Sequence, residues 1–158
     1  MSDKAITPAD IATITAAIIA CITFIVSTSI YIQTTRRERR VKTLDYWETI
    51  QPSLIQARKE LNEIHKGDWT KEDALIHLES SNLNIIVKGL NAFERLATGI
   101  NLDVYDLNVL NKLAGKMIID SYIAYIPLIV AREEQLGEGG IFREFEILYS
   151  KLLKIRNR

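Results

Sequence analysis

The sequence predicts an all-α protein, with one N-terminal transmembrane helix followed by a cytoplasmic bundle of about five helices. Three observations predict this fold class. An uncharged apolar run lies near the N-terminus, apolar residues recur at intervals of three and four in the remainder, and no stretch shows the period-two alternation of a strand. The predicted segments are a short extracytoplasmic N-terminus (1–10), the membrane span (11–32), a basic juxtamembrane helix that continues it (33–50) and a cytoplasmic helical domain (51–158).

The predicted span carries no charged side chain over 22 residues, of which sixteen are apolar and the others are Thr or Ser. As a helix it measures about 33 Å, against about 30 Å for the hydrocarbon core of a bilayer. Thr7, Pro8 and Asp10 are typical of a helix start. A buried helix of a soluble protein and a cleaved signal peptide are the alternatives. A signal peptide has its basic residues before the apolar run, whereas here they follow it.

Basic residues are concentrated at two places. Residues 36–42 hold five bases and one acid, the last eight residues hold four bases and no acid, and residues 43–150 hold 17 acids and ten bases. The first cluster predicts a cytoplasmic domain at a bacterial inner membrane, with the N-terminus outside. The acidic body argues against nucleic-acid binding. We expect both clusters to contact anionic lipid, although the second can also complement a helix dipole. The residues concerned are Arg36, Arg37, Arg39, Arg40, Lys42, Lys151, Lys154, Arg156 and Arg158.

Small side chains recur at intervals of three and four along one face of the predicted span. Such a stripe lets membrane helices approach closely, so we expect it to support a homo-oligomer. The only cysteine, Cys21, lies in the same segment, which excludes an intramolecular disulfide. The stripe consists of Ala12, Ala16, Ala20, Thr23 and Ser27.

The helices of the cytoplasmic domain are predicted from their apolar spacing and their end signals. Pro52 is expected to break or kink the first helix. The second helix should then end near Gly67, and Thr70 with Asp73 should cap a short helix. The strongest pattern covers residues 83–100, with Gly99 as its C-terminal stop.

Two further helices complete the prediction. Asp106 is expected to cap a helix that runs beyond Met117, and the last helix should start after Gly139-Gly140. Residues 117–130 contain only two polar side chains, Asp120 and Ser121. We interpret this run as a buried core helix with Asp120 paired inside and Pro127 kinking it or starting a new segment; a second membrane span is the alternative.

The run Leu90-Asn91-Ala92-Phe93-Glu94-Arg95-Leu96-Ala97-Thr98-Gly99-Ile100, followed by Val104-Tyr105-Asp106, resembles a bacterial and prophage family of uncharacterised membrane-anchored proteins. The resemblance implies an N-terminal span and a bacterial or phage origin. It implies no established activity, so no catalytic residue can be transferred. The motif residues are Asn91, Phe93, Glu94, Ala97, Gly99, Tyr105 and Asp106.

The two polar residues of the motif have two interpretations. Glu94 and Asn91 lie at the margin of an apolar stripe, where they can bond the backbone of residues 101–106 or the Tyr105 hydroxyl. In the alternative, Glu94 receives a ligand. The same choice between a functional and a structural role applies to Asp120.

Nothing in the sequence indicates catalysis or metal binding. The two histidines, His65 and His77, lack the spacing of a zinc site, and no phosphate-binding or nucleophile motif is present. We therefore expect neither a cofactor nor a metal. The leading hypothesis is a non-enzymatic interaction module on the bilayer, with a protein partner and a role in a host membrane or phage-infection process. The alternative is a membrane-perturbing effector that oligomerises through its span.

Overall fold

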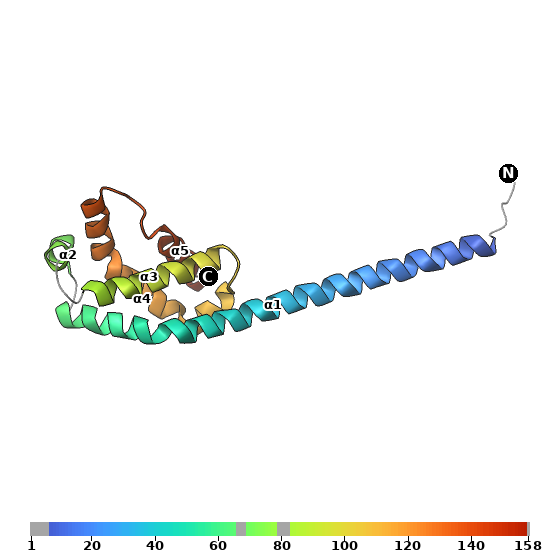
Figure 1. Cartoon of the computed structure of the whole chain (residues 1–158), viewed down its shortest axis with the longest axis horizontal. Coiled ribbons are helices and arrows are strands. Elements are labelled where there is room, and N and C mark those ends of the chain that lie inside the picture. The colour runs from blue at the N-terminus through green and yellow to red at the C-terminus, as the bar shows by residue number, and fades with distance from the viewer. Residues whose placement is uncertain (1–6, 66–68, 79–82, 158) are drawn as a thin grey trace. The chain divides into compact units, whose positions relative to one another are not determined.

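The computed structural model describes residues 7–65, 69–78 and 83–157, and within these residues it contains helices and no strands (Figure 1). The all-α prediction is confirmed. The predicted anchor, juxtamembrane helix and second helix form one element, so the described residues contain five helices in all. They are α1 (Pro8–Ile64), α2 (Lys71–His77), α3 (Leu83–Asn101), α4 (Leu107–Leu136) and α5 (Arg143–Arg156).

The chain divides into two compact units, with the boundary between Glu38 and Arg39. The first unit contains the N-terminal part of α1, and the second contains the rest of α1 with the four other helices.

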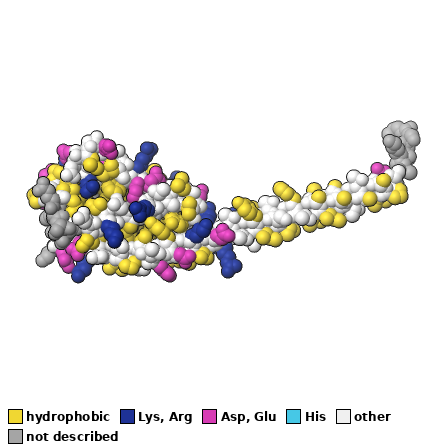
Figure 2. All heavy atoms as spheres, in the orientation of Figure 1, with side chains coloured by type: hydrophobic (Ala, Val, Ile, Leu, Met, Phe, Trp, Pro, Cys, Tyr) yellow, Lys and Arg dark blue, Asp and Glu magenta, His cyan; other side chains and the backbone are white. Residues whose placement is uncertain are grey.

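The first unit is a single helical segment with an apolar surface. Its start is the predicted one: the Asp10 amide donates to Thr7 Oγ1 at 3.3 Å, and the Thr7 amide donates to Asp10 Oδ2 at 2.9 Å. Its large apolar side chains are exposed, such as Phe24 at 72%, and Figure 2 shows them on the surface along the segment. By length and composition α1 can cross a membrane, and none of its most apolar 18-residue window is buried.

Pro52 does not end α1, so of the two predicted outcomes, a break or a kink, the break is excluded. The helix continues for twelve residues beyond it, to Ile64. A proline inside a helix costs about 3 kcal/mol because it removes a hydrogen bond and crowds the preceding turn. Residues on both sides of it, Ile50 and Leu54, are buried in the same core. This packing holds the helical conformation against the local cost.

The core of the second unit is formed by the inward faces of α1, α3, α4 and α5. α3 runs alongside the C-terminal part of α1 (Figure 1), and a Cβ added at Gly89 of α3 would collide with that of Ala57 of α1. Glycine and alanine therefore allow the two helices to approach closely. The largest fully buried side chains include Tyr125, Phe93, Phe145, Leu90, Leu96, Leu110, Ile118, Leu128, Leu148 and Leu152.

The end of α3 differs from the prediction. Gly99 lies inside the helix, which continues to Asn101. The amide of Val104 donates to the Gly99 carbonyl at 2.8 Å, and the amide of Asp103 donates to that of Ile100 at 3.2 Å. Asp103 has a φ of 59°. This bonding pattern is a Schellman motif in which an aspartate takes the left-handed position that glycine usually occupies.

Predicted helix starts at Thr70 and Asp106 are confirmed. The Asp73 amide donates to Thr70 Oγ1, and the Asp73 carboxylate accepts from the Thr70 amide at 2.8 Å. Asp106 Oδ1 accepts from the amides of Asn108 and Val109 at 2.9 and 3.1 Å. Gly67, the predicted end of the preceding helix, lies outside the described residues.

α4 continues through Pro127, so the new segment that was one of the two predicted outcomes does not start there; a kink was the other. Asp120 also differs from the prediction, because it does not lie inside the core. It pairs with Lys116 at 2.9 Å and is 42% exposed. α4 is the second helix that is long and apolar enough to cross a membrane, but 39% of its apolar window is buried in the structure.

Candidate functional site

The turn after α3, which carries the last two motif residues, is held by the basic segment of α1. The turn comprises residues 101–106, and we call it the α3–α4 turn. Arg39 donates from Nη2 to Asp103 Oδ1 at 2.8 Å and to the Tyr105 carbonyl at 3.0 Å. Arg40 Nε donates to Asp106 Oδ2 at 3.4 Å. Two arginines that the sequence suggested for the membrane surface thus bind this turn.

Thr43 connects α1 to the start of α4. Its hydroxyl accepts from the Asp106 amide at 2.7 Å and donates to the Arg39 carbonyl at 2.7 Å. The side chain is fully buried. The hydroxyl therefore satisfies the half-buried backbone amide just before α4.

Tyr105 packs between α1 and α3. Its ring stacks on that of Tyr46, with centroids 5.0 Å apart and planes 19° apart. A Cβ added at Gly99 would collide with the Tyr105 ring. Burial raises the pKa of both tyrosines, although Arg95 acts in the opposite direction on Tyr46. Gly99 is thus needed for the approach of an aromatic ring.

Glu94 has different partners from those predicted. It does not bond the α3–α4 turn; its two carboxylate oxygens accept from the amides of Glu144 and Phe145 at 3.1 and 2.8 Å. These amides lie at the start of α5, whose own N-cap residue, Phe142, makes no side-chain cap. Glu94 therefore caps a helix 50 residues away in sequence. Burial raises its pKa, with a smaller contribution from Glu144, while the two amides lower it.

Asn101 extends this connection between α3 and α5. Its amide donates to the Glu144 carboxylate at 2.7 Å, and its carbonyl oxygen accepts from Lys151 Nζ at 2.8 Å. One of the four bases of the C-terminal cluster is thus bound to the end of α3.

The remaining members of the two basic clusters lie in different settings. Arg36, Arg37, Lys42 and Lys154 are exposed. Arg156 donates to the Asn111 carbonyl and side-chain oxygens at 3.2 and 2.9 Å. Arg158 lies outside the described residues. The small-residue stripe of the first unit, Ala12, Ala16, Ala20, Thr23 and Ser27, is exposed throughout.

The apolar motif residues are core residues. Phe93 and Ala97 are buried, and the Phe93 ring stacks on that of Phe145 with centroids 4.7 Å apart. Asn91 is exposed, and it makes no hydrogen bond among the residues that the structure describes. The motif therefore combines one free polar side chain with residues that fix α1, α3 and α5 together.

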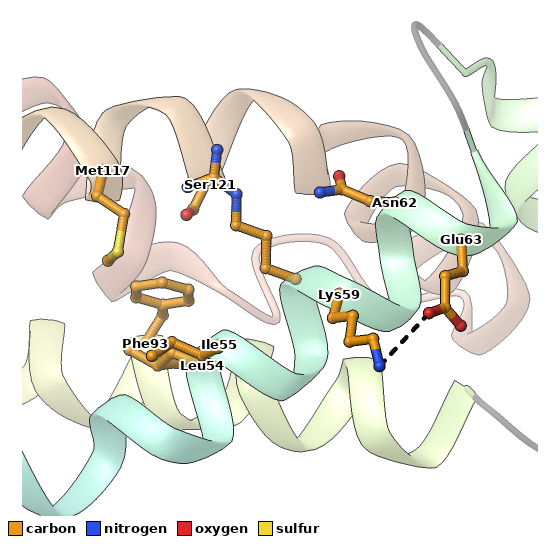
Figure 3. A pocket seen from close by; sticks show the side chains of 9 residues that line it. Leu54, Ile55, Lys59, Asn62, Glu63, Phe93, Met117 and Ser121 are labelled. Carbon is orange, nitrogen blue, oxygen red and sulfur yellow. Dashed lines mark ion pairs between the residues drawn. The ribbon is translucent and has the colours of Figure 1, made fainter.

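An apolar pocket of about 420 Å³ opens between α1, α3 and α4. Leu54 and Ile55 of α1 lie beside Phe93, and Met117 and Ser121 approach from α4 (Figure 3). Its rim is charged and includes Arg58 and an ion pair between Lys59 and Glu63. Ile55 is 59% exposed. The pocket can accept an apolar side chain of a partner.

Sequence reasoning missed the residues whose roles depend on distant partners. Nothing local to Thr43, Tyr46 or Ile55 distinguishes it from other residues on an amphipathic helix. A partial signal was present at Arg39 and Asp103, since an unbroken basic helix and an acidic turn are complementary in charge. Within the described ranges, no group of three or more His, Cys, Asp or Glu residues is placed to hold a metal ion.

Comparison with known families gives one match. A family model described as a domain of unknown function, DUF4760, matches residues 10–152, which include both the apolar segment and the helical domain. No curated protein and no solved structure matches the chain.

Proposed function

We propose that this chain, which belongs to the DUF4760 family of unknown function, is a membrane-tethered helical interaction module without enzymatic activity. The observation that carries the proposal is the exposed apolar segment at residues 11–32, joined in one chain to a unit with its own core. An apolar surface of this length is stable only when lipid or protein covers it.

Lipid is the cover that the sequence favours. The eight isoleucines of the segment favour insertion by roughly 2–5 kcal/mol, and no charge inside the segment opposes them. The exposed bases Arg36, Arg37 and Lys42 follow the segment directly, which corresponds to a cytoplasmic domain at a bacterial inner membrane. A prophage protein that acts on a host membrane or infection process fits this location.

The apolar pocket supports the interaction role. Its exposed wall residue, Ile55, can receive an apolar anchor from another protein, and the charged rim can orient it. The polar groups of the motif are occupied with joining helices, since Glu94 caps α5 and Asp106 caps α4. Binding, therefore, is the activity that the geometry supports best.

The test is affinity purification of the full-length protein from host membranes, with two matched variants. Ile55→Glu places a charge at the pocket, and Ile76→Glu places one on α2, at a residue that is 75% exposed. We expect a stoichiometric partner with the wild type and with Ile76→Glu, and its loss with Ile55→Glu. Self-association alone, abolished by deleting residues 1–35, would instead favour a membrane-perturbing effector.

A further inference from the structure

A second pocket, of about 550 Å³, lies between α1 and α3 in the second unit. We call it the α1–α3 pocket. Ala57 of α1 lies against Gly89 of α3, and Tyr46 of α1 stacks on Tyr105 of the α3–α4 turn. Two fixed contacts thus hold the walls, and the volume is in the range of small-molecule sites.

The wall formed by α3 carries polar side chains in a regular series. Asn84, Lys88, Asn91 and Arg95 all line the pocket, at intervals of four, three and four. Residues at these intervals lie on one face of a helix. α1 adds hydrogen-bonding groups from Tyr46 and Ser53. The pocket therefore has many groups that can donate hydrogen bonds.

The charge of the pocket is uncompensated. No aspartate or glutamate lines it, and neither Lys88 nor Arg95 forms an ion pair among the described residues. Glu94, next to Arg95 in sequence, is occupied at the start of α5. The domain as a whole is acidic, with 17 acids and ten bases over residues 43–150. Two cations that face one cavity without an acid favour an anionic ligand.

Apolar side chains from both helices form another part of the lining. Ile50, Val87 and Ala92 contribute to the lining, and Ile50 is buried. A bare inorganic anion would leave this surface without a partner. A ligand with both an oxyanion and an organic body would use the two kinds of wall together.

We propose that the α1–α3 pocket binds a small organic phosphate. Arg95 and Lys88 hold the phosphate oxygens, since a guanidinium pairs with phosphate through two parallel hydrogen bonds and a lysine adds a point charge. Asn84 and Asn91 add hydrogen bonds to the phosphate group, and the organic body lies against the apolar part of the lining. This inference goes beyond the proposed function, because it requires neither the anchor nor a protein partner.

The phosphate can come from a soluble ester or from a phospholipid headgroup, and the experiment separates the two. Full-length protein in phosphatidylcholine nanodiscs is titrated by calorimetry with phenyl phosphate, glycerol 3-phosphate and inorganic phosphate. We expect saturable binding, tightest for phenyl phosphate because its ring uses the apolar wall. A parallel sample in phosphatidylglycerol nanodiscs reports headgroup binding through the Arg95 side-chain NMR signal. A shift seen only in those discs, and reversed by phenyl phosphate, identifies the headgroup as the source.

The variants lie at exposed positions, so each should fold. Lys88→Gln and Arg95→Gln should each weaken binding about tenfold or more, and Asn91→Asp, which adds an acid, should abolish it. Lys112→Gln, at an exposed base of α4 outside the pocket, should leave affinity unchanged. The proposal is overturned by absence of both saturable binding and the NMR shift. Wild-type affinity in both Arg95→Gln and Lys88→Gln overturns it as well. So does a loss in Lys112→Gln that equals the loss in those two variants.

Discussion

At the end of α3, the absence of a side chain at Gly99 leaves the space that the Tyr105 ring occupies. The Tyr105 ring lies over the glycine and stacks on Tyr46, so one residue without a side chain permits a contact between α1 and the α3–α4 turn. The glycine has no left-handed conformation to explain it, because the positive φ of this region belongs to Asp103.

Gly99→Ala should destabilise the protein by about 1–3 kcal/mol, because the added methyl group forces the Tyr105 ring away from its stack. The measurement is chemical denaturation of the detergent-solubilised protein, followed by tryptophan fluorescence. Gly139→Ala is the control, since a Cβ there meets no atom within 4 Å. Equal stability of Gly99→Ala and wild type would contradict the ring-packing role.

Glu94 is the second residue whose local setting decides its role. Its carboxylate satisfies two amides at the start of α5, which has no side-chain cap of its own. Glu94→Ala should therefore cost about 1–2 kcal/mol at neutral pH, as expected for the loss of a helix cap. Glu94→Gln should cost less because its amide oxygen can still accept one bond. Glu48→Gln, at an exposed position of α1, should change stability by no more than a few tenths of a kcal/mol.

The pH dependence of Glu94 has a definite sign. Burial raises the pKa of Glu94 in the folded state above its ordinary value of 4.5. The folded state therefore binds the Glu94 proton more tightly than the unfolded state does, so protonation adds to stability. This contribution is complete below the pKa of Glu94 in the unfolded state and is lost as pH rises through its pKa in the folded state. Wild type should therefore gain stability relative to Glu94→Gln as pH falls from neutral toward 4.5. Parallel denaturation curves at several pH values measure this difference, and a gap that widens in favour of the glutamine variant would contradict it.

At the scale of elements, a buried hydroxyl links α1 to the start of α4. Thr43 accepts from the amide of Asp106, the N-cap of α4, and also bonds the Arg39 carbonyl of its own helix. Arg39 in turn holds the α3–α4 turn at Asp103. The start of α4 thus depends on α1 as well as on its own capping side chain.

Thr43→Val keeps the shape of the side chain but leaves the Asp106 amide without a partner. We expect a loss of about 1–3 kcal/mol, the usual cost of an unsatisfied buried donor. Thr49→Val is the matched control, since the Thr49 hydroxyl is exposed and bonds only the Asp45 carbonyl of the same helix. Urea denaturation of both variants measures the difference, and equal effects would exclude the proposed link.

The two prolines illustrate how packing overrides local preference in these elements. Pro52 and Pro127 both lie inside continuous helices, so neither ends its helix, which was one of the outcomes expected for each. The buried residues flanking them, Leu54 beside Pro52 and Leu128 beside Pro127, belong to one core. Local rules describe the cost of a proline correctly, but they do not include the burial on either side of it.

At the scale of the whole molecule, Cys21 tests what covers the apolar segment. Its side chain is exposed in the isolated chain, so it would react readily with a water-soluble maleimide if the protein were soluble. In intact membranes we expect no labelling of Cys21, and complete labelling after denaturation in detergent. A Gln56→Cys variant on the Cys21→Ser background, exposed on the second unit, should label once the cytoplasmic face is accessible. Rapid labelling of Cys21 in intact membranes would contradict the proposed anchor.

The sequence by itself determined the all-α class, the uncharged segment at residues 11–32 and the helix starts at Thr7, Thr70 and Asp106. Each depends on residues within one or two helical turns, so local chemistry is sufficient. Only the tertiary structure decided that Glu94 caps α5, that Arg39 binds the α3–α4 turn and that Asp120 lies at the surface. These partners depend on which helix faces are brought together, and many arrangements of the same amphipathic helices satisfy the sequence pattern equally well.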